Sequence, residues 1–313
     1  MRNKNIKWPL AFGLFLAMGW VSDSWSAQEP VSPATVPVTM LVSVEARHGK
    51  DIPNINREDV RVLRGKNHLQ VTGWVPMQSA QAELELCILL DDAADRDISL
   101  QFDDLRAFIN AQPSTTAIAV GYMHYGTVEM VQNFTKDHAQ AAKALRLSLG
   151  FAGGGASPYL SVSDLIKRWP ESPARHEIFM ISDGIDRLEG GPDDPYLATA
   201  IDDAQRAGVQ VYAIYAAGSG HFSHSFRRFN WGQNNLAQLA EETGAEAYFQ
   251  GFQTPVAFAP FLKEFADRLN HQYRLTILVP AGKKAGFQHI KLETEVPNAE
   301  LVVAEKVYVP AAK

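Results

Sequence analysis

Acidic side chains directly follow two apolar runs in this sequence. The run 84–90 (LELCILL) is followed at once by Asp91 and, after four more residues, by Asp95. A second run, 176–182 (HEIFMIS), is followed by Asp183. Carboxylates grouped in this way can hold a divalent cation through their oxygens, or they can cap helices and keep strand ends solvated. The choice between the two depends on the elements that position these acids.

Apolar runs alternate with helical patterns across the middle of the chain. The runs are almost continuously apolar, which is typical of parallel strands covered on both faces. Apolar residues between them recur at helical spacing, and Gly208 and Gly244 each stand just after a helical pattern, where a left-handed cap is common. The alternation predicts a doubly wound, mostly parallel α/β domain over 82–271, with 127–131 as an antiparallel edge strand. Its other predicted strands are 84–90, 116–123, 176–182, 209–216 and 245–250.

Both ends of the chain beyond this domain are rich in β-branched residues. Three strands are too few to stand well alone, so the segments 38–81 and 272–313 are expected to pack together as one small β-sandwich. The α/β domain is then inserted in, or flanked by, that sandwich. The predicted strands are 39–46, 59–65 and 68–75, which include a hairpin, and 273–279, 289–296 and 301–309.

The first 26 residues have the pattern of a secretory signal peptide. Three basic residues precede the apolar stretch 8–21, and small residues follow it up to Ser26, where we expect cleavage. A retained membrane anchor is the alternative, but the stretch is shorter than the ~20 residues of a spanning helix. Residues 27–37 are rich in proline and are expected to form an extended linker. These features predict a secreted or periplasmic protein with no membrane span after cleavage.

Composition restricts the classes of partner and of site. The formal net charge of −6 opposes non-specific binding of nucleic acid. The single cysteine, Cys87, lies within an apolar run. An intrachain disulfide and a cysteine-rich zinc site are therefore excluded, and a buried core thiol is expected.

The acidic turns resemble the site of a von Willebrand factor A domain. That family binds a divalent cation at a metal-ion-dependent adhesion site, with D-x-S-x-S after the first strand, a Thr in a middle loop and an Asp, often in D-G, after a later strand. On this resemblance Asp91 and Asp183 match the two acids, and Ser157 in "GGGASP" matches the threonine. The two serines are lost, because Ala93 and Asp95 stand in their places.

These departures weaken the metal site that the resemblance implies. Mg²⁺ requires six oxygens at about 2.0–2.1 Å in nearly octahedral geometry. Ala93 offers none, and Asp95 would add a third carboxylate around one divalent ion. We therefore expect a degenerate adhesion site that holds either Mg²⁺ or Ca²⁺ in a structural role or no ion. Its implied ligands are Asp91, Asp95, Ser157 and Asp183.

A narrower resemblance covers nearly the whole mature chain. Residues 42–75, with "EDV" at 58–60, are similar to the segment that precedes the A domain in the secreted VWFA-related family common in acidobacterial genomes. Residues 236–249 and 271–280 are similar to that family's last helix–strand pair and its closing β segment. The resemblance implies an exported protein-binding role of adhesion or scaffold type, and it implies no enzymatic activity.

The segment 219–230 (SGHFSHSFRRFN) is predicted to be a long loop on the side of the acids. Its two histidines could bind a transition metal with a third ligand, or they are ordinary polar loop residues. Its aromatic and arginine side chains form either an exposed hot spot for a protein partner or a satellite core under the loop. The residues predicted to bind a partner, here and in the acidic turns, are Asp92, Asp186, His221, Phe222, His224, Phe226, Arg227 and Arg228.

No pattern of a nucleophile beside its base, such as G-x-S-x-G, and no H-E-x-x-H motif occurs in the sequence. The chain is therefore predicted not to be an enzyme. The alternative from a different class is a divalent-metal-dependent phosphohydrolase that uses Asp91, Asp95 and Asp183. Its weakness is that no fixed Lys or Arg is expected beside these acids to bind a phosphoryl group.

Overall fold

A computed structural model describes residues 35–78, 82–149, 156–188, 194–219 and 226–312. The predicted signal peptide and most of the predicted linker lie outside these residues. Strand β1 (Thr35–Ala46) already begins inside the predicted linker, so the linker boundary at residue 37 is wrong. Pro37 is tolerated there because this half of β1 pairs only with β10 (Gln272–Pro280), which leaves the other side of the strand open.

The middle of the chain forms a six-stranded sheet in the order β6-β5-β4-β7-β8-β9. All neighbouring strands are parallel except β6, which runs antiparallel to β5 as the edge strand. The doubly wound, mostly parallel sheet predicted from the apolar runs is therefore confirmed. The strands are β4 (Leu84–Asp91), β5 (Thr116–His124), β6 (Thr127–Thr135), β7 (Arg175–Ser182), β8 (Gln210–Tyr215) and β9 (Ala247–Tyr248).

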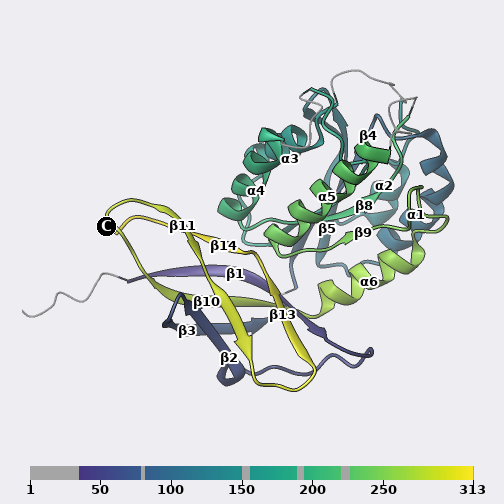
Figure 1. Cartoon of the computed structure of the whole chain (residues 1–313). Helices are drawn as coiled ribbons and strands as arrows, with labels where there is room; N and C mark the ends of the chain where they lie inside the picture. The colour runs from purple at the N-terminus through teal and green to yellow at the C-terminus, as the bar shows by residue number, and fades with distance from the viewer. Residues whose placement is uncertain (1–34, 79–81, 150–155, 189–193, 220–225, 313) are drawn as a thin grey trace, which may run out of the picture. The chain divides into compact units, whose positions relative to one another are not determined.

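Helices pack on this sheet and bury its strands. Helices α3, α4 and α5 contact one another in series, while α1 contacts both α2 and α6 (Figure 1). Strand β4 is consequently almost wholly buried, and Cys87 within it is a buried free thiol as predicted. Gly208 and Gly244 follow α4 and α5 with φ of 69° and 77°, as the sequence predicts. The helices are α1 (Phe102–Asn110), α2 (His138–Lys143), α3 (Pro158–Arg168), α4 (Pro195–Ala207), α5 (Phe226–Thr243) and α6 (Ala259–Asn270), with 3-10 turns η1 (Arg57–Asp59) and η3 (Arg96–Gln101).

Strands from both ends of the chain form a second, antiparallel sheet in the order β12-β2-β3-β10-β1-β13. A two-stranded sheet, β11-β14, packs with it, because Val307 and Val309 of β14 share a core with Val38 and Val42 of β1. This arrangement confirms the predicted β-sandwich beside the α/β domain. Its other strands are β2 (Val60–Arg64), β3 (Asn67–Pro76), β11 (Gly286–His289), β12 (Lys291–Thr294), β13 (Ala299–Val303) and β14 (Lys306–Val309).

The last two predicted strands, 289–296 and 301–309, have wrong boundaries. Within 301–309 the strand is interrupted at residues 304 and 305, because β13 pairs with β1 while β14 pairs with β11 in the small sheet. Within 289–296 only 291–294 pairs with β2, as strand β12. Alternating polarity alone does not show that a strand changes partner part-way along.

No helix in the described parts of the chain is long and apolar enough to cross a membrane.

Candidate functional site

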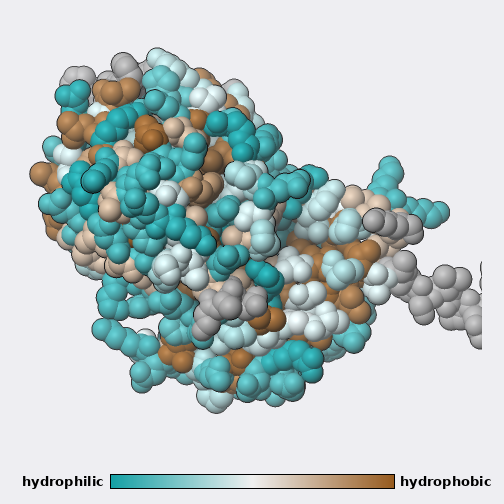
Figure 2. All heavy atoms as spheres, turned by 180° about the vertical axis from the view of Figure 1, so that it is seen from behind, coloured by the Kyte–Doolittle hydropathy of each residue, from teal (hydrophilic) through white to brown (hydrophobic). Residues whose placement is uncertain are grey.

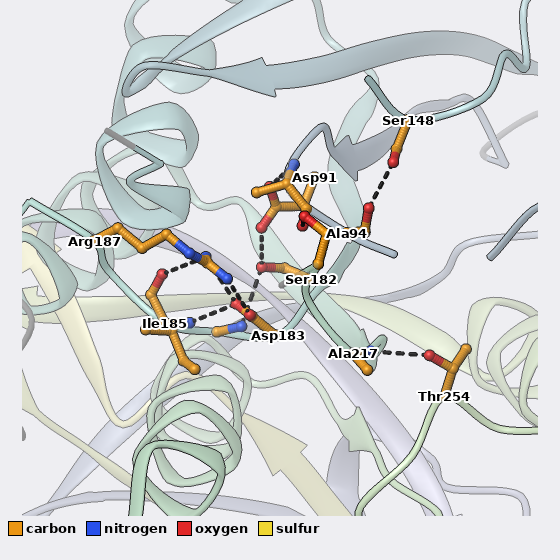
Figure 3. A network of polar contacts seen from close by, with 12 residues as sticks. Asp91, Ala94, Ser148, Ser182, Asp183, Ile185, Arg187, Ala217 and Thr254 are labelled. Carbon is orange, nitrogen blue, oxygen red and sulfur yellow. Dashed lines mark hydrogen bonds and ion pairs between the residues drawn. The ribbon is translucent and has the colours of Figure 1, made fainter. Parts of the chain in front are cut away.

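The carboxyl ends of β4 and β7 place Asp91 beside the turn that follows β7. These strands are parallel neighbours, with Leu90 opposite Ile181, so Asp91 and Ser182 lie next to each other. The Ser182 hydroxyl donates to Asp91 Oδ2 at 2.7 Å, and the Ala93 backbone N–H donates to Asp91 Oδ1 at 2.8 Å (Figure 3). Both oxygens of this buried carboxyl thus have donors from the protein.

Asp183 forms an ion pair with Arg187, four residues further on. Arg187 Nη2 lies 2.5 Å from Asp183 Oδ2, and Nη1 lies 3.3 Å from Oδ1. The Asp183 side chain is 1% exposed and the Arg187 side chain 8% exposed. Gly184 between them has φ of 69°, and its left-handed conformation turns the chain so that the guanidinium reaches back to the carboxylate (Figure 3).

Ser157 joins this cluster from the start of α3. Its hydroxyl donates to Asp186 Oδ2, and its oxygen caps the helix by accepting from the Leu160 N–H. The Arg187 N–H also donates to the carbonyl of Ala156, at 2.7 Å. The structure therefore brings the turns at Asp91, Ser157 and Asp183 together at one end of the parallel sheet.

Burial and charge shift the pKa values in the cluster. Burial raises the pKa of Asp91, the nearby Asp183 carboxylate raises it further, and Arg187 opposes both. Burial alone would lower the pKa of Arg187, but the carboxylates of Asp183, Asp91 and Asp186 outweigh it and raise that pKa. Arg187 is thus held as a cation by acids from two different turns.

Comparison with solved structures finds von Willebrand factor A structures among its matches. The ArnB paralog VWA2 from Sulfolobus acidocaldarius matches with TM-score 0.41 and 9% identity over 88% of this chain and 76% of that chain. A von Willebrand factor type A structure from Catenulispora acidiphila matches with TM-score 0.44 and 11% identity over 89% and 75%. An aerotolerance-related membrane protein from Bacteroides fragilis matches with TM-score 0.44 and 14% identity over 60% and 98%. No protein-family model and no curated protein matches the chain.

The strand order and the position of the acids identify the fold. The doubly wound sheet has an antiparallel edge strand, and its central neighbours β4 and β7 end in Asp91 and Ser182-Asp183. The middle loop that precedes α3 brings its hydroxyl to the same place. The α/β domain has the fold of a von Willebrand factor A domain. In that A domain the cluster described above stands where the family's cation site is expected.

The residues of this A domain do not fit a divalent cation at that place. The oxygens of Asp91, Asp183 and Ser157 are engaged by serine, arginine, aspartate and backbone partners. Ala93 offers no side-chain oxygen, and no group of three acidic, histidine or cysteine side chains among the described residues is arranged to hold a metal. The Arg187 guanidinium is already a buried cation, and a second cation beside it would be repelled.

Asp95 and Asp92, which the sequence places near this site, have other contacts. Asp95 caps η3, since its Oδ1 accepts from the Asp97 N–H at 3.0 Å, and its role as a metal ligand stays a prediction. Asp92 is 2% exposed and accepts two hydrogen bonds from Arg146, at 2.7 and 2.9 Å. Asp186 is also buried, at 5% exposed. Asp92 and Asp186 therefore offer no surface to a partner, and their predicted role as direct contacts is corrected.

The predicted loop 219–230 is helical from Phe226 onward, because α5 begins there. Phe226 is exposed and Phe229 is buried, so the aromatic residues divide between a surface and a satellite core. Arg227 is exposed and Arg228 is half-buried, both in the first turn of α5. The candidates His221, Phe222 and His224 lie outside the described residues.

Arg187 is the residue of the cluster that the sequence pattern did not reveal. No cationic residue was expected near the acids, yet Arg187 follows Asp183 by four residues in "SDGIDR". Within a helix, an acid and an arginine four residues apart commonly form an ion pair. Asp183 and Arg187 lie in a turn with left-handed Gly184 between them, so the helical rule does not predict their contact. An Arg within the turn that carries the distal acid is the signal that could have found it.

Proposed function

We propose that this protein is an exported protein-binding module of adhesion or scaffold type. Its contact surface would be the loops at the carboxyl end of the A-domain sheet. The partner would be a protein that presents apolar side chains, and it would bind without a bridging metal ion. The leader at residues 1–26 supports export to the periplasm or the outside.

The observation that carries the proposal is a set of exposed apolar side chains on the loops at this end of the sheet and at the start of α5. We call them the apolar rim. Figure 2 shows hydrophobic residues scattered among hydrophilic ones over the A domain. Exposed aromatic side chains are typical of protein-binding surfaces, where they carry much of the binding energy. The rim comprises Leu147 (52% exposed), Leu149 (45%), Leu188 (49%), Phe226 (65%) and Phe252 (62%).

Contacts below the rim hold its side chains in place. The Phe226 and Phe252 rings lie 5.5 Å apart, and Phe252 in turn packs edge-on against buried Phe229 at 4.5 Å. The Leu149 N–H donates to Asp92 at 3.2 Å, which fixes that loop above the sheet. A surface fixed in advance loses less conformational entropy on binding.

The rim proposal is tested by paired substitutions and cross-linking. A photo-cross-linking residue at position 149 or 226 should capture a discrete protein partner in the cell envelope, in the presence or absence of EDTA. L149D and F226D should each weaken that capture at least tenfold, whereas V75D, at an exposed apolar site on β3, should not. Equal effects of all three variants would refute the rim, and N-terminal sequencing that finds an uncleaved cytosolic chain would refute export.

The alternative of a metal-dependent hydrolase has less support in this geometry. It requires carboxylate oxygens that can turn to an ion, and Asp91 and Asp183 are committed to Ser182, Arg187 and backbone donors. A screen of phosphate esters with added Mg²⁺ or Mn²⁺ tests it directly. Turnover that disappears in D91N would replace the binding proposal by an enzymatic one.

A further inference from the structure

The Arg187 side chain lies inside the acid cluster and not on the surface above it. Its Nη2 contacts Asp183 Oδ2 at 2.5 Å, and its Nη1 also donates to the Ile185 carbonyl at 3.3 Å (Figure 3). With 8% of the side chain exposed, the guanidinium is largely removed from water. A charge buried to this degree is costly unless acids around it compensate.

The surrounding backbone is shaped to this ion pair. A methyl group at Gly218 would lie 2.1 Å from Asp183 Oδ2 and 2.5 Å from Arg187 Nη2, so an alanine there requires the ion-paired side chains to shift. The segment around Gly218 is itself fixed, because the Asp95 N–H donates to the Ala217 carbonyl and the Ser219 N–H to the Ala93 carbonyl, each at 2.8 Å. The turn after β8 thus closes over the first acidic turn and over Arg187.

Charge balance assigns the guanidinium a role that packing alone would not. Asp91, Asp183 and Asp186 are each at most 5% exposed, and each one raises the pKa of Arg187. Without a cation, these neighbouring buried carboxylates would repel one another in a region of low dielectric constant.

We propose that Arg187 is a built-in cation that takes the place of the divalent ion, so that the protein itself completes the cluster at all metal concentrations. The side chain neutralises Asp183 directly and Asp91 and Asp186 through space. No coordination position remains for a partner's carboxylate. This inference concerns the cluster alone, and it holds or fails independently of the apolar rim.

The test compares the full chain with Arg187→Ala by calorimetric titration and thermal unfolding in MgCl₂, CaCl₂ and EDTA. The wild type should bind neither ion, and its melting temperature should not respond to EDTA. Arg187→Ala should melt at a lower temperature and should recover by about 5 °C or more in millimolar CaCl₂, MgCl₂ or guanidinium chloride, because a free cation then fills the vacated place. Arg146→Ala, which removes the partner of Asp92, is the matched control and should show no such recovery.

Wild-type binding of either ion that is lost in Asp183→Asn would overturn the proposal. So would an Arg187→Ala variant that no cation stabilises. The double variant Asp183→Asn/Arg187→Gln has neither charge of the ion pair, and it covers the case in which Arg187→Ala does not fold. The double variant should be more stable than Arg187→Gln alone, and its melting temperature should not respond to Ca²⁺, Mg²⁺ or guanidinium. A double variant no more stable than Arg187→Gln would mean that Arg187 acts only through packing.

Discussion

At the scale of single residues, Gly218 is the point where the cluster is most sensitive to added volume. Its backbone conformation is not left-handed, so the obstacle to alanine is the close approach of the Asp183 and Arg187 side chains. We expect G218A to push the guanidinium away from its carboxylate and to lower the free energy of unfolding by about 1–3 kcal/mol. Denaturant unfolding measures this loss.

Gly286 in β11 provides the matched control for Gly218. A methyl group there meets nothing within 4 Å, and its φ is also not left-handed. G286A should therefore be close to neutral. Equal stability of G218A and G286A would show that the ion pair does not depend on the closed turn above it.

The residue types of the sequence predict where the acidic side chains lie, but not which groups form hydrogen bonds with them. Asp91 and Asp183 follow apolar strands, and parallel strands end at one edge, so their convergence follows from the pattern. Their hydrogen-bond partners come from Ser182, Ala93 and Arg187, and those choices depend on local turn geometry. The exposure of Asp92 likewise could not be predicted, because the arginine that buries it lies 54 residues away in sequence.

At the scale of elements, helix α5 lies so close to the turn after β7 that it carries a glycine at the contact, although glycine is a poor helix former. Gly232 stands inside α5, where alanine would ordinarily be favoured by about 1 kcal/mol. A methyl group at Gly232 would lie 2.0 Å from the carbonyl oxygen of Asp183, a backbone atom that cannot easily move. The close approach keeps α5 against the turn that carries Asp183.

These two effects predict opposite signs for G232A. Propensity alone predicts a more stable protein, whereas the clash should cost more than propensity gives and lower the unfolding free energy by about 2 kcal/mol or more. The matched control is N234A, two residues further along the same helix. The Asn234 side chain is exposed, so its replacement by alanine should create no such clash. Thermal or urea unfolding decides the sign, and a stabilised G232A would refute the tight crossing.

The elements themselves were predictable to different degrees. Strands β4, β5, β7 and β8 follow from apolar runs that only a sheet covered on both faces explains. The start of α5 could not be predicted from the pattern, because its first residues, FRRFN, are aromatic and charged without an apolar stripe. The exchange of partners between β13 and β14 also depends on which distant strand offers an open edge.

At the scale of the whole molecule, a buried polar cluster joins the two sheets. Glu177 on β7 is 0% exposed, and neither of its carboxyl oxygens has a hydrogen-bond partner among the described residues. Arg175 beside it donates to the Gln272 side chain at the start of β10. The Gln272 amide nitrogen donates to Gln210 Oε1, at 2.8 Å, and to the Tyr212 hydroxyl, at 3.3 Å. Burial raises the pKa of Glu177 to about 7, and Arg175 and the nearby Gln272 side chain only partly oppose this.

The raised pKa of Glu177 predicts how the stability of the protein changes with pH. The folded protein holds this proton more tightly than the unfolded chain, so the stabilising contribution is complete below pH 4.5 and is lost as the pH rises through about 7. The shift corresponds to about 3 kcal/mol. E177Q keeps the shape and removes the charge, so its unfolding free energy should fall less than that of the wild type between pH 5 and 8, and E177Q should be the more stable protein at pH 8. E58Q, at an exposed position beside β2, should follow the wild type. Parallel pH profiles for E177Q and the wild type would mean that Glu177 stays ionised in the folded protein and that the contact between the two sheets tolerates its charge.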